Sequence, residues 1–349
     1  MNFASDNWAG PSRAVAEALE AARAGSAPAY GADEWTRRAE ERFAELFERE
    51  VRVFFVATGT AANALSLATA STPGGVILAH AESHAADSEA GAVEFASGMR
   101  LARIAGPLGR ITPEALEATL KRYGSVMAGR AVALTLSQAT ELGTVYSPGE
   151  IAALAAIAHE AKLVVHMDGA RFANAVVGLG AGPADVTWRA GVDILSFGGT
   201  KNGCWCAEAI VVFDQRLAAD LPFALKRAGH VLSKARFVAA QFLAYLEGGH
   251  WLDNAVHANA MAQRIGEGLP PGGPVRLAWA SEANEVFLIW PRALGARLAG
   301  RGARFHEWQT EALPEGVWVG ADEQLVRLVT SFATRPEEVG RLLDALGEG

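Results

Sequence analysis

The chain has 349 residues, and 50% of them are hydrophobic, which is enough for one large and one smaller domain with buried cores. Acidic residues outnumber basic ones by 39 to 31, so no strong positive field is present to hold nucleic acid or an anionic membrane. The first residues lack the basic start and apolar core of a signal peptide, and no apolar run reaches membrane-spanning length. We therefore expect a cytoplasmic protein with no nucleic-acid and no membrane partner.

From about residue 50, short apolar runs alternate with segments of helical period, which is typical of a mostly parallel sheet with helices on its faces. Seven strands are expected, at 53–57, 76–79, 101–104, 131–137, 163–167, 193–196 and 209–213. Thr112 and Ser147 can cap the amides of helices that begin with proline, and this predicts crossover helices at 113–123 and 148–161. An Ala-rich stretch predicts one long helix over 224–246.

The rhythm of the sequence changes after Gly248 and Gly249, which predicts a domain boundary there. Beyond it, strands near 286–290 and 325–330 and helices near 292–299 and 336–346 indicate a smaller α+β domain. We expect an N-terminal arm of residues 1–12, a large domain of residues 13–248 and a small C-terminal domain of residues 249–349.

The first candidate site follows the strand that ends at Ala57 and reads Thr58-Gly59-Thr60-Ala61-Ala62-Asn63. Small residues at such a junction let backbone amides and a hydroxyl approach a phosphate, and the start of a helix adds favourable charge. The same residues also make an ordinary helix start, so this motif alone does not decide between the two interpretations.

The second candidate site is Asp168 with Arg171, where the strand at 163–167 ends. An aspartate below a pyridine ring would keep the ring nitrogen protonated, as pyridoxal-phosphate (PLP) chemistry requires. Arg171 offers a planar fork for a carboxylate. The alternative is a helix-capping aspartate beside a surface arginine.

The third candidate site is Lys201, which follows the strand at 193–196 and is surrounded by small residues. Such a lysine can be desolvated, which lowers its pKa and frees its amine to attack an aldehyde. A solvated surface lysine is the alternative, and it explains these neighbours poorly. His84 follows the strand at 76–79, where its ring could stack on a flat cofactor or move protons, although a lone histidine is more often structural. Ser5 and Arg327 are uninformative alone.

Taken in order, several of these segments closely resemble the low-specificity L-threonine aldolase family, and the likeness spans nearly the whole chain. They are Phe3-Ala4-Ser5-Asp6-Asn7, Thr58-Gly59-Thr60-Ala61-Ala62-Asn63, His84 with Glu89-Ala90-Gly91, His166-Met167-Asp168-Gly169-Ala170-Arg171-Phe172, Ser196-Phe197-Gly198-Gly199-Thr200-Lys201-Asn202-Gly203, Leu232-Ser233-Lys234-Ala235-Arg236, and Val326-Arg327-Leu328-Val329-Thr330-Ser331-Phe332. The resemblance implies the α/β fold of PLP-dependent enzymes of fold type I, with a large mostly parallel seven-stranded sheet domain and a small C-terminal α+β domain.

The resemblance also implies roles for single residues. Lys201 would carry PLP as a Schiff base, and Asp168 would pair with the pyridine nitrogen. Gly59 and Thr60 would bind the phosphate, and His84 would stack on the ring. The substrate carboxylate would be held by Ser5, Arg171 and Arg327. No metal is implied, and the family's active sites lie at the interface of a dimer, often within a tetramer, so a homo-oligomer is expected.

The expected reaction splits threonine, allo-threonine or related β-hydroxy-α-amino acids into glycine and an aldehyde, with His84 as the first candidate base. Several family members have a second histidine near the substrate hydroxyl, and this chain has Thr140 in its place. A threonine can hydrogen-bond the hydroxyl but cannot act as a base at neutral pH. The smaller side chain leaves room for a bulky aldehyde, such as that from phenylserine.

Three other functions remain as alternatives. A PLP-dependent β-eliminating lyase or an aminotransferase shares the same placement of aspartate and lysine, but would use Lys201 to remove the α-proton. A dinucleotide oxidoreductase is suggested only by Gly178-Leu179-Gly180-Ala181-Gly182, which does not lie between a strand and a phosphate-binding helix. A non-catalytic binding module would hold no cofactor.

Overall fold

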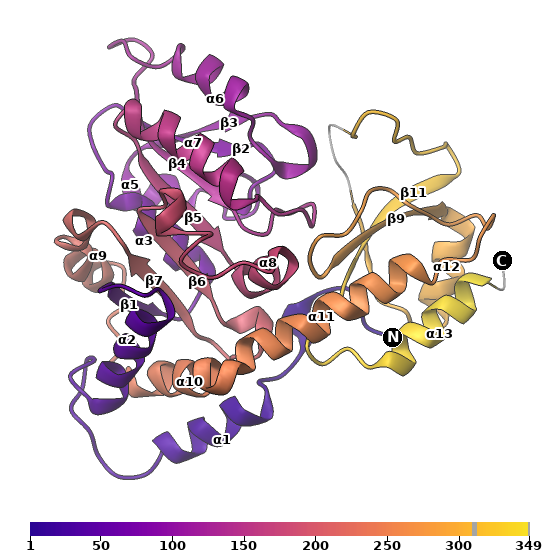
Figure 1. Ribbon diagram of the computed structural model, residues 1–349, viewed down its shortest axis with the longest axis horizontal. Coiled ribbons are helices and arrows are strands. Elements are labelled where there is room, and N and C mark those ends of the chain that lie inside the picture. Colours follow the sequence, from indigo (N-terminus) through magenta and orange to yellow (C-terminus); the bar gives the residue numbers. More distant parts are fainter. Residues whose placement is uncertain (309–312, 348–349) are drawn as a thin grey trace.

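The computed structural model describes residues 1–308 and 313–347, and it contains a seven-stranded and a four-stranded sheet (Figure 1). The large sheet has the order β1-β7-β6-β5-β4-β2-β3. Its strands are β1 (Arg52–Val56), β2 (Gly75–His80), β3 (Arg100–Ile104), β4 (Arg130–Ser137), β5 (Val164–Gly169), β6 (Ile194–Gly198) and β7 (Glu208–Val212). All seven expected strands are present, and only β7 pairs antiparallel with its neighbours. The prediction of a mostly parallel seven-stranded sheet is confirmed.

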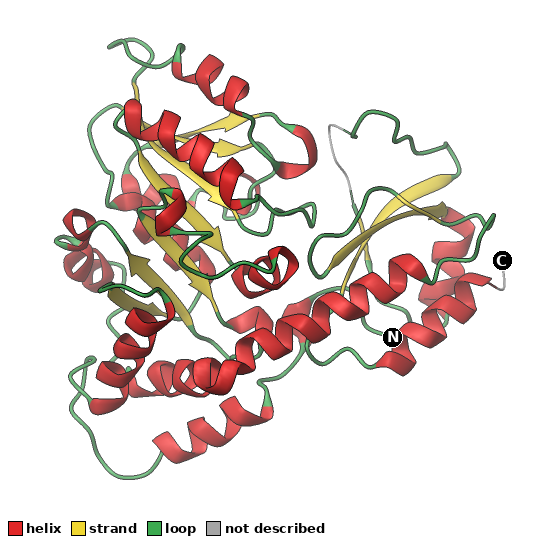
Figure 2. Ribbon diagram, viewed as in Figure 1, coloured by secondary structure: helices red, strands yellow, loops and turns green. Residues whose placement is uncertain are grey.

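Helices cover both faces of this sheet (Figure 2). They are α1 (Arg13–Ala22), α2 (Glu34–Leu46), α3 (Gly59–Ala68), α4 (His84–Asp87), α5 (Ala92–Ser97), α6 (Pro113–Leu120), α7 (Pro148–Glu160), α8 (Phe172–Leu179), α9 (Leu221–Arg227) and α10 (Arg236–Leu246). Successive residues of β6 point to opposite faces: Leu195 joins the core that contains α2, α7 and α10, and Ile194 joins the core beside α3 and α9. The sheet is therefore buried on both sides, as its apolar strands predict.

The two crossover helices begin where their caps predict. The Thr112 hydroxyl accepts a hydrogen bond from the Ala115 amide at the start of α6. At the start of α7, Ser147 and Glu150 form a reciprocal capping box.

The prediction of one long helix over 224–246 is wrong, because α9 ends at Arg227 and α10 begins only at Arg236. Gly229 adopts the left-handed conformation (φ +78°), and the His230 amide donates to the Leu225 carbonyl 2.8 Å away. Both features are typical of a helix end. The Ala-rich composition favours helix throughout this stretch, so it gave no sign that the helix ends at Arg227.

The small sheet consists of β8 (Arg276–Leu277), β9 (Glu285–Pro291), β10 (His306–Glu307) and β11 (Glu323–Val329), in the order β10-β11-β9-β8. It is antiparallel and packs with α12 (Arg292–Gly300) and α13 (Pro336–Gly347). The expected small α+β arrangement is confirmed.

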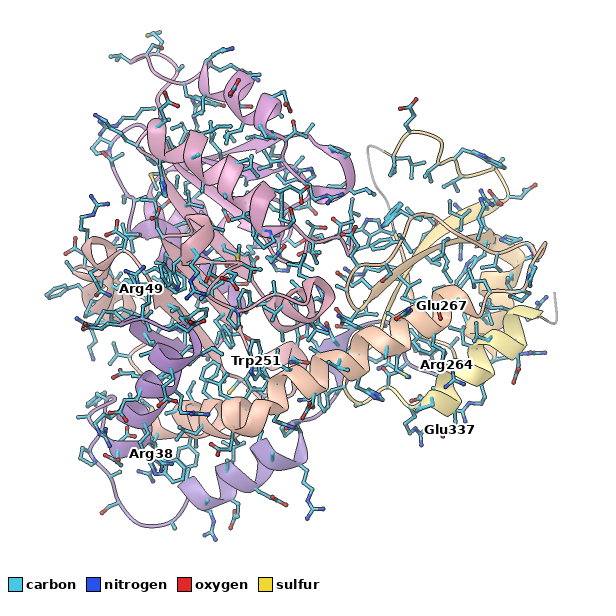
Figure 3. The ribbon with its side chains drawn as sticks, viewed as in Figure 1. Arg38, Arg49, Trp251, Arg264, Glu267 and Glu337 are labelled. Atoms are coloured by element: carbon cyan, nitrogen blue, oxygen red, sulfur yellow. The ribbon has the colours of Figure 1, made fainter. Side chains whose placement is uncertain are left out.

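A long helix, α11 (His250–Glu267), links the two sheets. At its start, Trp251 is 2% exposed and stacks on Phe172 in the core of the large sheet, whereas Ile265 belongs to the core of the small one. Figure 3 shows Trp251 at this junction and Arg264 at the other end of the helix, near α13. The predicted domain boundary at residues 248–249 thus coincides with the start of a helix that contributes to both cores. The division into two domains stays a prediction. In the described part of the chain, no helix has the length and apolarity needed to cross a bilayer.

Candidate active site

Loops that follow β1, β2, β5 and β6 meet at a cavity of about 270 Å³. Its lining includes the phosphate-binding candidates at the start of α3, the cofactor-binding candidates Asp168 and Lys201, and two further carboxylates. The complete lining is Asn7, Ala57, Thr58, Gly59, Thr60, Asn63, His84, Glu89, Asp168, Ala170, Thr200, Lys201 and Glu208. The carboxyl ends of parallel strands meet at one edge of a sheet, which explains why residues far apart in the sequence share this cavity.

Asp168 lies at the end of β5, is 6% exposed, and is held in place by two hydrogen bonds. Its Oδ2 accepts from Asn63 Nδ2 at 2.9 Å, and its Oδ1 accepts from the Ala170 amide at 3.0 Å. Asn63 Nδ2 also donates to Glu89 Oε1 at 2.9 Å. One amide on α3 therefore fixes two of the carboxylates that line the cavity.

Lys201 lies in a short 3₁₀ turn directly after β6, where the chain leaves little space around the backbone. A Cβ at Gly198 would lie 2.6 Å from the Ala170 carbonyl oxygen, and one at Gly199 would lie 2.7 Å from the Ala207 carbonyl oxygen. Glycine at 198 lets the loop with Lys201 approach the loop after Asp168, and glycine at 199 lets it pack against the segment that precedes β7. The small residues around Lys201 are thus explained by backbone packing that brings its amine to the cavity.

Glu208 is a buried carboxylate that sequence reasoning missed. It begins β7, is 6% exposed, and its Oε1 accepts a hydrogen bond from the Thr200 amide at 3.3 Å. Burial raises the pKa of Glu208 to about 7, against the lowering effects of the Thr200 hydrogen bonds and the Lys201 charge. A charged residue at the head of an otherwise apolar strand was the only sequence signal for it.

His84 begins α4, and its Nδ1 lies 3.0 Å from Glu89 Oε1. The Glu89 hydrogen bond raises the pKa of His84, while partial burial acts in the opposite direction. The imidazole is therefore a stronger base than a free histidine, because Glu89 stabilises its protonated form.

Replacing Glu89 with Gln should lower the pKa of His84, because an amide cannot stabilise an imidazolium ion as a carboxylate does. A histidine NMR titration measures this pKa, and the acidic limb of kcat/KM should move to lower pH with it. Asp87→Asn is the matched control, since Asp87 lies on the same helix but faces the exposed Arg103. An unchanged His84 titration in Glu89→Gln would contradict the role of Glu89.

The start of α3 forms another part of the cavity wall. Thr58 caps this helix by accepting from the Ala61 amide, so the amides of Gly59 and Thr60 lie in the first helical turn, where amides have no partner within the helix. A Cβ built on Gly59 would meet nothing within 4 Å, so a ligand can approach the backbone. The arrangement suits an anion such as a phosphate.

Residues 2–288 match the sequence model of the β-eliminating lyase family. The low-specificity L-threonine aldolase of Pseudomonas sp. (strain NCIMB 10558) is 41% identical over 308 residues, which are 88% of this chain and 89% of the relative. The chain belongs to the low-specificity L-threonine aldolase family. The resemblance of the sequence motifs is thereby confirmed, and the family is one of PLP-dependent enzymes.

Solved structures show the fold that this family member shares. The Leishmania major threonine aldolase superposes with a TM-score of 0.92 at 24% identity, covering 99% of this chain and 98% of its own. Oryza sativa TDC, solved with PLP and tryptamine, gives a TM-score of 0.77 at 13% identity, covering 99% of this chain and 82% of its own. The expected fold type I of PLP-dependent enzymes is confirmed.

In this family member, the three residues expected to hold a substrate carboxylate lie around one ionic cluster beside the cavity. Arg171 is 6% exposed, and its Nε and Nη2 donate to the two oxygens of Asp6 at 2.8 and 3.1 Å. Arg327 on β11 reaches the same cluster, with Nη1 3.3 Å from Glu285 Oε1. The Ser5 hydroxyl, next to Asp6, accepts from the Asn7 amide. The sequence did not predict a role for Asp6, which belongs to the N-terminal motif, or for Glu285.

Thr140, unlike Ser5, Arg171 and Arg327, belongs neither to the cavity lining nor to the ionic cluster beside it. It is 1% exposed, and its hydroxyl lies 2.9 Å from that of Thr144 and donates to the Leu108 carbonyl. Contact between Thr140 and substrate remains a prediction.

The described residues include no cluster of three or more His, Cys, Asp or Glu side chains suited to a metal ion.

His166 lies behind Asp168 on β5 and is fully buried, with Nδ1 2.8 Å from the Thr135 hydroxyl and Nε2 2.9 Å from the Ser196 hydroxyl. Burial lowers its pKa from 6.5 to about 4, so the folded state binds fewer protons than the unfolded state between these values. The contribution of the neutral His166 to the stability of the folded state is therefore fully present above about pH 6.5, and it is lost progressively as the pH falls to about 4.

Replacing His166 with Gln should remove this contribution to acid sensitivity, which amounts to about 3 kcal/mol over the whole interval. Denaturant titrations at several pH values measure the free energy of unfolding of both proteins. The wild type should lose more stability on acidification than the variant, whatever the variant's stability at neutral pH. Parallel curves would contradict the assignment of a buried neutral imidazole.

Proposed function

We propose that this chain is a PLP-dependent aldolase that cleaves L-threonine, L-allo-threonine or related β-hydroxy-α-amino acids, such as phenylserine, into glycine and an aldehyde. The observation that carries the proposal is the shared cavity of Lys201 and Asp168, which follow neighbouring strands of one sheet. The name of the Pseudomonas relative supports the same reaction.

The residues of the cavity fit PLP. Lys201 provides an amine for the cofactor aldehyde, and Asp168 provides a buried, oriented carboxylate for the ring nitrogen. The open helix start at Gly59 provides a place for the phosphate. Two buried atoms on the cavity lining, Asn63 Oδ1 and Glu89 Oε2, have no hydrogen-bond partner among the described residues, as expected at a site built for a polar ligand. When bound, PLP supplies an electron sink for the electron pair of the broken Cα–Cβ bond.

The protein's own residues then have distinct tasks. Lys201 binds the cofactor covalently, and Asp168 holds a proton at the ring nitrogen. Arg171 and Arg327 hold the substrate carboxylate and so fix which Cα bond faces the electron sink.

The proton of the β-hydroxyl needs a separate acceptor. His84, supported by Glu89, accepts this proton directly or through water. Glu208 lines the same cavity as Lys201, and because burial raises its pKa to about 7, it can also hold a proton there near neutral pH.

The proposal includes a homo-oligomer, dimer or tetramer, with the active site at the dimer interface. Phe95 on α5 is 90% exposed and lines a hollow of about 420 Å³ that it shares with Thr58 and Thr60, residues that also line the active-site cavity. Phe223 on α9 is 75% exposed nearby. An apolar surface of this kind, next to the phosphate site, supports a subunit contact there. Light scattering during size-exclusion chromatography tests the oligomeric state.

Product analysis tests the proposed reaction. The purified protein is incubated with PLP and with L-threonine, L-allo-threonine and both L-phenylserine diastereomers, and glycine and aldehyde are measured. Equal amounts of the two products support the aldolase. Pyruvate with ammonia would instead indicate a β-eliminating lyase, a keto acid would indicate an aminotransferase, and the absence of glycine from all four would overturn the proposal.

A further inference from the structure

A third carboxylate, Glu285, lies between the two arginines proposed to hold the substrate carboxylate. It begins β9 and is 0% exposed. Its Oε1 lies 3.4 Å from Arg171 Nη1 and 3.3 Å from Arg327 Nη1, so a single oxygen joins both guanidinium groups. Its Oε2 is buried and has no hydrogen-bond partner among the described residues.

The remaining charged groups that face this cluster come from separate elements. Asp6, in the 3₁₀ turn Asp6–Trp8, holds the Nε and Nη2 side of Arg171. Glu141, in the loop after β4, lies 3.9 Å from Arg327 Nη1. Asn284 adds one neutral donor, to Asp6 Oδ2 at 3.1 Å. Around Glu285, three carboxylates, its own included, therefore face two guanidinium groups when all are ionised, which leaves an excess negative charge there. The charge of Lys201 also acts on Asp6, from the adjoining cavity.

A substrate carboxylate would bring a fourth negative charge into this buried cluster. Like charges repel strongly where little water screens them, so the cluster binds another carboxylate best when one of its own is neutral. Asp6 cannot easily fill that role. Burial raises its pKa, but the charges of Arg171 and Lys201 and the hydrogen bonds from Arg171 and Asn284 together keep it low. Burial instead raises the pKa of Glu285, despite the opposing effects of Arg171 and Arg327.

We propose that Glu285 is a positioning residue that holds Arg171 and Arg327 at one point and takes up a proton when the substrate carboxylate binds them. The proton comes from solvent and binds the carboxylate of Glu285, whose Oε2 has no other partner, and no covalent bond of the substrate changes in this step. Protonation frees the two guanidinium groups for the incoming carboxylate. This inference rests on the proposed function, since it concerns the same carboxylate site.

The pH dependence of KM tests the proposal with Glu285→Gln, which keeps the shape of the side chain but cannot titrate. On the alkaline side of the Glu285 pKa, the wild-type KM should rise by up to about tenfold per pH unit relative to that of the variant. In Glu285→Gln, KM should be lower at alkaline pH, and kcat should change less than KM. Glu323→Gln is the matched control, because it removes a Glu–Arg pair of the same small sheet, with Arg276, outside the cluster.

Calorimetry gives a readout that does not depend on turnover. Glycine is titrated into the holoenzyme in buffers of different ionisation enthalpy, which yields the number of protons exchanged on binding. The glycine amine contributes equally in both proteins, so the wild type should take up more protons per bound glycine than Glu285→Gln. If Glu285→Gln does not fold, Glu285→Asp replaces it: this variant keeps a titratable group and should keep a pH-dependent KM.

These experiments distinguish the failure of the Glu285 proposal from the failure of the proposed function. Equal proton uptake and parallel KM profiles for wild type and Glu285→Gln, or a KM independent of pH in Glu285→Asp, would overturn the role of Glu285 while leaving the aldolase intact. Failure of the wild type to form glycine from any β-hydroxy amino acid would overturn the proposed function itself.

Discussion

Lys201→Ala is expected to lower glycine formation by about 10³-fold or more, the scale on which loss of a covalent catalytic group usually acts. Lys201 is the lysine that lines the cavity with Asp168, and the packing at Gly198 and Gly199 directs its loop to that place. The measurement is the rate of glycine release from L-threonine with added PLP. The variant should also lose the absorbance of bound cofactor.

Lys121→Ala is the matched control, because Lys121 is exposed at the end of α6 and does not line the cavity. It should retain wild-type activity and absorbance. Full activity in Lys201→Ala would show that another group holds the cofactor, and the assignment of the cavity would then be wrong.

Asp168→Asn should reduce kcat by about 10²- to 10³-fold, comparable to the loss of one preorganised electrostatic group in an active site. The amide has nearly the same shape, so its Oδ1 can still accept from the Ala170 amide. It carries no negative charge, however, and cannot hold a proton on a ring nitrogen. Steady-state rates with saturating PLP separate this effect from weaker cofactor binding.

The control for Asp168 is Asp185→Asn, which removes an exposed aspartate paired with Arg189 four residues later in the chain. Its kcat should be unchanged. A kcat for Asp168→Asn within about twofold of wild type would contradict the role of the carboxylate, since electrostatic contributions of this kind are rarely that small.

The sequence predicts the cavity well because its residues follow strands. In a parallel sheet, the ends of strands converge, so Lys201 and Asp168 could be placed together from the strand pattern alone. Registers confirm this: Asp168 on β5 pairs with Ser196 on β6, five residues before Lys201. The apolar strands and the polar residues at their ends are local patterns, so they can be recognised in a single sequence.

The ionic cluster could not be predicted in the same way. Asp6 and Asn284 are separated by 278 positions. They meet because the N-terminal segment bonds to the small domain through Phe3 and to the loop after β6 through Ser12. A lone glutamate at the head of β9 has no local pattern that distinguishes Glu285 from a surface residue. Its burial and its two arginine partners depend on tertiary packing.

Thr140 and the helix at 224–246 show two further limits of sequence reasoning. The resemblance placed Thr140 near the substrate, but the polar partners of its hydroxyl, at Leu108 and Thr144, depend on how two loops fold together. The break between α9 and α10 depends on one left-handed glycine, Gly229, within an otherwise helical composition. Both features concern backbone conformation that composition does not specify.

Peptide mapping after borohydride reduction tests most directly whether PLP is bound covalently at Lys201. The chain has five lysines, Lys121, Lys162, Lys201, Lys226 and Lys234, so four of them serve as internal controls. After reduction of the holoenzyme, mass spectrometry should find the pyridoxyl-phosphate group on the peptide that contains Lys201, and on no other lysine peptide. A stoichiometric label on another lysine, or no label on a protein that forms glycine, would contradict the account.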